Sequence, residues 1–437
     1  MPELLQQVRL IDPVSQTDRI ADVLIEAGSV RQIADRITDL PTDTSILDCR
    51  GMILAPGLVD LYSRSGEPGF EERETLDSLA HAAAAGGFTQ VAILPSTLPP
   101  LDNPASIAWF LEQQNSKFKI QNSNSSSHPS TPPPLHPPTP SLLPWAALTL
   151  DVKGQQMTEL AELALTGSVG FGDGRPIANL LLVRRMLEYL HPLGKPVLLW
   201  ACDPELTGNG VMREGHDSIV LGLPGIPAIA ETTALAALLE CVAETGTPVH
   251  FMRISTARGV ELIRAAKAQG VPIRASTTWM HLLLNTTAIQ SYDPNLKLNP
   301  PLGTPADQLA LCHAVQAGVL DAIAIDHSPY SYEEKTVAFA EAPNGAIGLE
   351  LVLPLLWHTF VELNRWTALE LWTALSTRPA QCLQQSPPAI ELNKPGEMIL
   401  FDPHQEWEVE PRSLKSLSAN TPWFGKKIQG RVTKIWC

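Results

Sequence analysis

The sequence predicts an α/β fold: a TIM-type (β/α)8 barrel with a small composite β-sandwich domain made from both chain ends. Two observations predict the barrel. Eight short apolar runs alternate with segments of helical periodicity, and most of these segments end at a glycine. Apolar runs separated by helices are typical of parallel strands, and eight such units close a barrel. An open doubly wound sheet is the alternative, because periodicity does not show closure.

The eight predicted strands lie within residues 56–389, the predicted barrel. They are Leu58–Tyr62, Gln90–Leu94, Trp145–Leu150, Ser168–Gly172, Val197–Cys202, Val249–Ile254, Pro272–Thr277 and Asp321–Asp326. In the intervening segments, such as "QQMTELAELALTG", leucine and alanine recur at steps of three and four residues. This spacing places the apolar side chains on one face of a helix.

The two chain ends have a different pattern. Residues 1–55 hold short runs of alternating polarity, and the "EAGS" step between two of them predicts a β-hairpin. Residues 390–437 contain two further strand-like runs, "GEMILFDPHQEWEVE" and "GRVTKIWC". We therefore predict one small β domain composed of residues 1–55 and 390–437.

One segment, Asn115–Ser141, breaks the barrel pattern. Serine, asparagine and proline dominate it, so it cannot form a core, and we predict a disordered surface insert. A proline-rich docking site is the functional alternative for this segment.

Composition excludes several classes of protein. The chain has 437 residues, 44% of them apolar, and a net charge of −15, which argues against a nucleic-acid surface. No apolar run is long enough to span a membrane, and the N-terminus lacks the pattern of a secretory signal. Its six cysteines form no CxxC pair, which is typical of reduced thiols. A cytoplasmic protein is expected.

In a barrel of this type the chemistry lies at the carboxyl ends of the strands. The polar or aromatic side chains that end the predicted strands are Tyr62, Arg64, Ser96, Asp173, Trp200, Arg253, Trp279, His281, Asp326 and Tyr330.

Several long motifs resemble dihydroorotases of the amidohydrolase superfamily. They are "GLVDLYSRSGEPG", "GLPGIPAIAE", "KLNPPLGT", "DAIAIDHSPY", "YEEKTVAFAEAPNGAIGLE" and "NTPWFGKKIQGRV". They cover nearly the whole chain except the insert, and they occur in the family's order. The resemblance implies an amidohydrolase-type barrel and a place in de novo pyrimidine biosynthesis.

The resemblance also implies a zinc site, and the sequence departs from it. The family binds zinc through a His-x-His pair, a carboxylate or modified lysine, two further histidines and an aspartate. The corresponding positions here are Tyr62, Arg64, Asp173, Trp200, Arg253 and Asp326. Arginine cannot ligate a metal, because its guanidinium stays protonated and has no free lone pair. We therefore expect no metal and no cofactor, and we interpret Asp326 as the vestige of the family's general base.

The family's substrate contacts are altered as well. Its carboxylate-binding arginine, asparagine and histidine correspond to Gly66, Ser96 and Tyr330. Asn299 in "KLNPPLGT" is a further position that we interpret as a vestige of the family's substrate site. Arg64 and Arg253 are expected to pair with Asp326, Asp173 or Asp60, because two cations stand where the family binds a dication.

These losses predict a dihydroorotase-like pseudoenzyme. Degenerate members of the family serve as non-catalytic partners of aspartate carbamoyltransferase, so the resemblance implies that partner and an oligomer.

Two alternatives stay open. The chain could be an active cyclic-amide hydrolase that forms dihydroorotate from N-carbamoyl-L-aspartate, with zinc at an unusual site of Asp173, Cys202 and Asp326, or without metal. It could also be a scaffold like the degenerate dihydropyrimidinase relatives. The histidines near the mouth, His250, His281 and His327, are interpreted as structural. Lys153 is the candidate for a metal-bridging lysine in the enzyme alternative.

Overall fold

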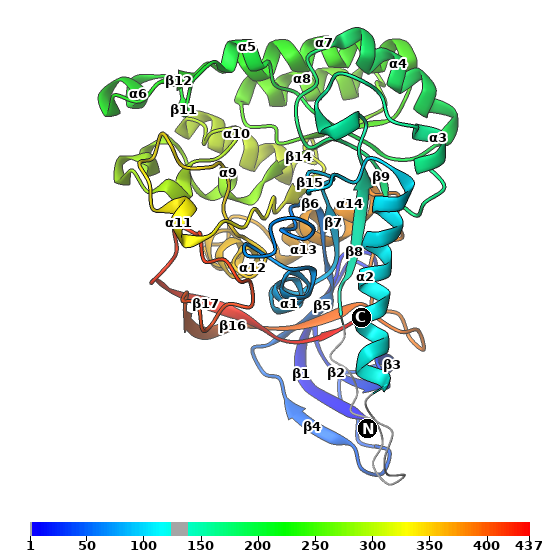
Figure 1. Ribbon diagram of the computed structural model, residues 1–437. Helices are drawn as coiled ribbons and strands as arrows, with labels where there is room; N and C mark the ends of the chain where they lie inside the picture. The colour runs from blue at the N-terminus through cyan, green and yellow to red at the C-terminus, as the bar shows by residue number, and fades with distance from the viewer. Residues whose placement is uncertain (1, 124–138) are drawn as a thin grey trace.

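The computed structural model describes residues 2–123 and 139–437 and has an eight-stranded parallel barrel at its centre (Figure 1). Neighbouring strands follow the order β6, β7, β8, β9, β10, β13, β14 and β15. The predicted fold class is therefore confirmed. The strands are β6 Leu58–Ser63, β7 Phe88–Ile93, β8 Ser141–Ala146, β9 Gly170–Phe171, β10 Val197–Trp200, β13 Val249–Met252, β14 Ile273–Thr278 and β15 Ala322–Ala324.

The last strand closes onto the first. The backbone N–H of Asp326 donates to the Tyr62 carbonyl at 3.1 Å, and that of Arg64 donates to the His327 carbonyl at 2.8 Å. The Asp60 carboxylate bridges the same seam by accepting from the Ile325 N–H at 2.8 Å. The open doubly wound alternative is therefore wrong.

The helices that follow the strands form the outer layer. They are α1 Leu76–Gly86, α2 Pro104–Ser123, α3 Leu160–Leu163, α4 Leu180–Leu190, α7 Ile229–Thr245, α8 Ala257–Ala268, α10 Pro305–Gln316, and α13 Ala368–Trp372 with α14 Arg378–Cys382. Helix α1 shows why such a segment begins and ends where it does. The Thr75 hydroxyl accepts from the Ser78 N–H, and Gly87 ends the helix at φ +85°.

Shorter elements lie between the barrel strands and the helices of the outer layer along the chain. They are α5 Pro204–Thr207, β11 Met212–Arg213, α6 His216–Leu221, β12 Gly225–Ile226, α9 Trp279–Leu283, α11 Tyr332–Lys335 and α12 Val352–Leu356. Segments α5 to β12 project from one side of the barrel (Figure 1).

Both chain ends join a second sheet below the barrel (Figure 1). Its strands are β1 Glu3–Asp12, β2 Thr17–Glu26, β3 Ser29–Ala34, β4 Ser45–Asp48, β5 Ile53–Pro56, β16 Met398–Glu408 and β17 Lys427–Trp436. Strand β5 lies between β1 and β16 and so connects the two ends of the chain. The "EAGS" hairpin is confirmed, with Ala27 and Gly28 at φ +49° and +76° in the turn between β2 and β3.

The third barrel strand and the insert differ from the prediction. Strand β8 begins at Ser141 rather than Trp145. Pro144 has no N–H to donate, but its carbonyl still accepts from the Val169 N–H at 2.9 Å, so the strand continues through the proline. Residues 115–123 of the predicted insert continue helix α2, since no glycine or proline interrupts them. Residues 124–138 lie outside the described part of the chain.

No helix among the described residues is long and apolar enough to cross a membrane.

Candidate functional site

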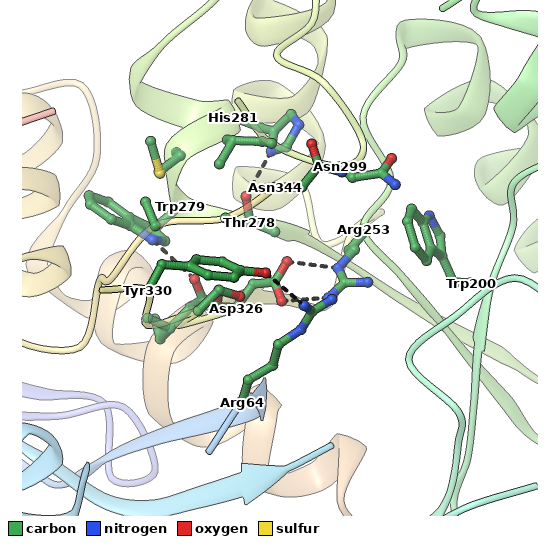
Figure 2. Close-up of a pocket in the computed structure, with 16 residues that line it drawn as sticks. Arg64, Trp200, Arg253, Thr278, Trp279, His281, Asn299, Asp326, Tyr330 and Asn344 are labelled. Atoms are coloured by element: carbon green, nitrogen blue, oxygen red, sulfur yellow. Dashed lines mark hydrogen bonds and ion pairs between the residues drawn. The ribbon is translucent and has the colours of Figure 1, made fainter. Parts of the chain in front are cut away.

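The carboxyl ends of the barrel strands surround a cavity of about 130 Å3 (Figure 2). Strands β6, β10, β13 and β15 end at or just before the residues that line it. Its chemically important lining residues are Arg64, Trp200, Arg253, Asn299, Asp326 and Tyr330. The structure thus brings together most of the residues predicted from the strand ends.

The central feature of the cavity is an ion pair between Arg253 and Asp326. The Arg253 Nε donates to Asp326 Oδ2 at 2.7 Å, and its Nη2 donates to Oδ1 at 2.5 Å. The Arg253 side chain is 1% exposed and that of Asp326 is 17% exposed. Burial alone lowers the pKa of Arg253, but the charge and hydrogen bonds of Asp326 raise it overall. The predicted pairing of these two residues is confirmed.

Each of the three nitrogens of the Arg253 guanidinium donates a hydrogen bond. Its Nη1 donates to the Gly174 carbonyl at 3.0 Å, and its face lies over the Trp200 ring, 4.7 Å from the ring centroid. Arg253 and Asp326 both adopt positive φ, +59° and +53°, a conformation that costs a non-glycine residue about 1–2 kcal/mol. Strained residues of this kind cluster at functional sites.

The Tyr62 side chain hydrogen-bonds to the backbone of Arg253, beside the ion pair. Its hydroxyl accepts from the Arg253 N–H at 3.1 Å and lies 3.1 Å from the Ser276 hydroxyl, which in turn bonds to His250 Nε2 at 2.8 Å. Burial raises the pKa of Tyr62 and lowers the pKa of His250 to about 3. All three side chains are therefore neutral near pH 7, and His250 has the structural role that the sequence predicts.

Arg64 differs from the prediction. Its Nη1 contacts the Tyr330 hydroxyl at 3.4 Å, and its buried Nε has no hydrogen-bond partner. Within residues 2–123 and 139–437 it forms no ion pair, so the expectation that both arginines pair with carboxylates is wrong for Arg64.

The carboxylates of Asp60 and Asp173 accept hydrogen bonds from hydroxyl and backbone N–H groups, not from an arginine. Asp60 accepts from the Ser63 hydroxyl at 2.5 Å and from the Ile325 N–H at 2.8 Å. Asp173 accepts from the backbone N–H groups of Leu148 and Thr149 at 2.7 and 3.1 Å. Burial raises the pKa of Asp60 to about 7 and that of Asp173 to about 6.

The predicted substrate positions separate into two groups. Asn299 and Tyr330 line the cavity, whereas Ser96 and Gly66 are not among its lining residues. Gly66 has no room for a side chain, because an added Cβ would lie 2.3 Å from the Phe70 carbonyl oxygen. A residue with a side chain therefore does not fit at this position without a shift of the backbone.

His281, His327 and Cys202 contact other residues of the fold. His281 bonds to the Thr278 hydroxyl at 2.7 Å through Nδ1, and burial lowers its pKa to about 4. His327 accepts from the Gly348 N–H at 3.2 Å, and the Cys202 thiol lies 3.4 Å from the Thr207 hydroxyl.

Sequence reasoning placed Trp279 at the end of the seventh strand, and it missed one contributor to the cavity, Asn344. Asn344 follows a proline in the "EAPNGA" segment, a turn signal inside a motif that was used only for kinship. The Trp279 ring nitrogen donates to the Ile325 carbonyl at 3.1 Å and so fixes α9 against β15. No local pattern identifies that contact, because the partners are far apart in sequence.

Comparison with solved structures shows which proteins share this fold. The fold matches an L-hydantoinase (dihydropyrimidinase) from Arthrobacter aurescens, with TM-score 0.79, 18% identity, and coverage of 99% of this chain and 94% of that one. A dihydropyrimidinase from Brevibacillus agri matches with TM-score 0.78, 19% identity, and coverage of 100% and 93%. The chain thus has the same fold as these hydantoinases and dihydropyrimidinases. No family model matches the chain.

Sequence relatives then identify the family. A Synechocystis protein named as dihydroorotase-like is 45% identical over 98% of this chain and 97% of its own length. Dihydroorotases of Syntrophus aciditrophicus and a Geobacter species are 35% and 36% identical, covering 99% and 98% of this chain and 97% and 96% of their own lengths. The chain belongs to the dihydroorotase family, and the resemblance predicted from the motifs is confirmed.

This kinship corrects the expectation that no cofactor is involved. Dihydroorotases and hydantoinases are zinc-dependent amidohydrolases, so membership in the family contradicts that expectation. The side chains at this mouth nevertheless do not fit the ion. Zinc needs three or four N, S or O donors, and the described residues contain no group of three His, Cys, Asp or Glu that could hold a metal. Asp173, Cys202 and Asp326 therefore do not form the alternative site.

The ion pair makes a prediction about stability. Arg253→Leu is expected to lower the free energy of unfolding by about 3–5 kcal/mol, because Asp326 is left without its counter-charge. The double variant Arg253→Leu with Asp326→Leu is expected to regain most of the loss, since apolar residues often replace a buried ion pair without cost. Urea denaturation followed by circular dichroism measures both.

Arg258→Leu is the matched control. Arg258 pairs with Glu261 at 2.7 Å on an exposed face of α8, and its loss is expected to change stability by no more than about 0.5 kcal/mol. A double variant as unstable as Arg253→Leu would contradict the role given to the ion pair.

Asp60 makes a prediction about pH. Its folded pKa of about 7 lies above the ordinary value of 3.8, so the folded state holds a proton that the unfolded state has already lost between pH 4 and 7. Stability from this group therefore falls as pH rises through that window. Asp60→Asn removes the titration, so its stability relative to the natural protein is expected to increase steadily from pH 4 to 7. Denaturation at several pH values tests this, and a constant difference would contradict it.

Proposed function

We propose that this member of the dihydroorotase family does not turn over dihydroorotate itself and acts as a non-catalytic partner of aspartate carbamoyltransferase in pyrimidine biosynthesis. The observation that carries the proposal is the bidentate pair of Arg253 with Asp326. In the family's scheme this aspartate is the general base, and a base must be able to take a proton from water in the reacting geometry. Here both carboxylate oxygens already accept from one guanidinium.

Two further features support the proposal. The loop at Gly66 leaves no room for a substrate-binding side chain, and the donors at the mouth do not fit zinc. The barrel nevertheless keeps an intact core. The barrel fold is kept although the residues at its strand ends differ from the family's pattern. A role in assembly would require this, because assembly depends on the outer surface of the barrel and not on the residues at the strand ends.

An active cyclic-amide hydrolase is the competing function. Kinship favours it, since proteins named dihydroorotase match 97–99% of this chain at 34–36% identity. The family's zinc dependence favours it as well. Turnover distinguishes the two functions directly.

The first test is turnover by the purified chain in both directions, from N-carbamoyl-L-aspartate and from dihydroorotate, with and without added zinc. We expect no conversion above the uncatalysed rate under any condition. Zinc-dependent turnover that disappears in Asp326→Ala would contradict the proposal and establish an unconventional metal site. The Syntrophus dihydroorotase is a suitable positive control.

The second test is complex formation. Aspartate carbamoyltransferase from the same organism, mixed with the chain at about 10 μM each, is expected to co-elute with it on size exclusion, with the mass measured by light scattering. An unrelated protein of similar mass and acidity controls for non-specific association. Separate elution at this concentration, together with unchanged carbamoyltransferase activity, would contradict the partnership.

A further inference from the structure

The loop between strands β16 and β17 connects the small β domain to the barrel mouth. We call residues 414–423 of this loop the strap. The strap lies on the side of the barrel that carries α11 and α12 (Figure 1). Leu414, Ser416, Ser418 and Asn420 are buried, whereas Lys415 is exposed between them. One side of the strap therefore packs against the rest of the molecule.

The C-terminal half of the strap holds residues of the barrel mouth. The Asn420 side chain donates from Nδ2 to the Ser328 carbonyl at 3.0 Å and accepts at Oδ1 from the Tyr330 N–H at 3.1 Å. The Trp423 ring stacks on the Trp279 ring, with the two centroids 5.1 Å apart. Ser328, Tyr330 and Trp279 all line the mouth cavity, and the strap residues do not. The strap therefore fixes one wall of the cavity from outside.

Two buried carboxylates hold the N-terminal half of the strap. Glu350 accepts from the N–H groups of Lys415 and Ser416 at 2.8 and 3.1 Å. Glu74 accepts from the Ser416 hydroxyl and from the Leu417 N–H, the latter at 3.1 Å. Glu74 is fully buried and Glu350 is 7% exposed. Ser416 thus bridges the two carboxylates, because it donates its N–H to one and its hydroxyl to the other.

Hydroxyl, amide and imidazole donors surround Glu74. The Ser78 hydroxyl of α1 donates to it, and His327 Nε2 lies 3.4 Å away. His327 Nδ1 accepts from the Gly348 N–H at 3.2 Å, so the ring is the neutral tautomer with its proton on Nε2. In the described part of the chain, no lysine or arginine forms an ion pair with Glu74 or with Glu350.

Glu350 lies near one cation and one anion. Burial raises the pKa of Glu350 to about 7, and the charge of Glu74 adds to the rise. The N–H groups of Ser416 and Lys415 lower it, as does the charge of Arg431 on β17, whose guanidinium donates to a backbone carbonyl at 2.9 Å. A closed strap therefore keeps a proton on Glu350 that a hydrated glutamate loses near its ordinary pKa of 4.5.

We propose that the strap is a proton-dependent latch of the barrel mouth: it is closed while Glu350 holds its proton, and ionisation of Glu350 releases it together with residues 328–330. Ionisation places two negative charges on either side of Ser416 with no cation bound to either. Release of the strap hydrates Glu350 and so removes the cost of burying its charge. Release also frees the segment that Asn420 holds, which loosens one wall of the cavity.

Hydrogen exchange of the full chain, followed by mass spectrometry at pH 5, 6, 7 and 8, tests the latch. Opening releases one proton, so it becomes easier between the ordinary and the raised pKa of Glu350 and nearly constant above them. After correction for the intrinsic exchange rate, protection of strap peptides is expected to fall about tenfold from pH 5 to 6 and by about twofold or less from pH 7 to 8. Peptides covering residues 327–332 are expected to follow the strap.

Variants locate the titrating group and the connection to the mouth. Glu350→Gln keeps an oxygen that accepts from the strap but cannot ionise, so the pH dependence is expected to disappear. Asn420→Ala is expected to leave the pH dependence in the strap and to remove it from residues 327–332. Glu261→Gln, which removes an exposed carboxylate from α8, is the matched control and is expected to leave both unchanged. Thermal unfolding of each variant verifies that it is folded.

Strap protection that stays constant from pH 5 to 7 would overturn the inference, and so would a pH dependence that persists in folded Glu350→Gln. Exchange of residues 327–332 that is independent of the strap in the natural protein would refute the connection to the mouth. These measurements use neither a substrate nor a partner protein, so their outcome is independent of whether the chain catalyses a reaction or binds aspartate carbamoyltransferase.

Discussion

The ion pair between Arg253 and Asp326 connects the ends of β13 and β15 across the barrel mouth, and the other contacts of the mouth are arranged around it. Tyr62 accepts from the backbone of Arg253 and gives its own carbonyl to the N–H of Asp326, so the first strand is joined to both members. Trp200 covers the guanidinium face. Two charges this well buried are stable only together, because either one alone would lose its hydration without compensation.

The mouth and the barrel core are separable parts of the molecule. Apolar side chains inside the barrel and between strands and helices hold the fold, whereas the polar residues follow the strand ends. Replacement of polar residues at strand ends therefore leaves the core unaltered. This separation explains how the chain keeps the family's fold at 34–36% identity to proteins named dihydroorotase while its mouth presents arginine, tyrosine and tryptophan.

The sequence predicted the architecture well, for identifiable reasons. The alternation of apolar runs with helical segments located all eight barrel strands, because strands buried on both faces must be continuously apolar. The sequence pattern misplaced the start of β8, because Pro144 and the prolines before it are atypical of a strand. It also predicted that α2 ends earlier than it does. The site residues were found from the strand ends, and charge balance predicted that the arginines pair with Asp60, Asp173 or Asp326 without choosing among them.

What the sequence by itself determined was the fold class, the family, and the residue types that stand at the mouth. Periodicity and long motifs depend on neighbouring residues, so they can be read without coordinates. The tertiary structure decided how the charges are distributed. It assigned Asp326 to one arginine, placed Asp60 and Asp173 against backbone amides and hydroxyls, and left the buried Nε of Arg64 without a hydrogen-bond partner. These outcomes depend on distances between strand ends far apart in sequence, and only the closed barrel sets those distances.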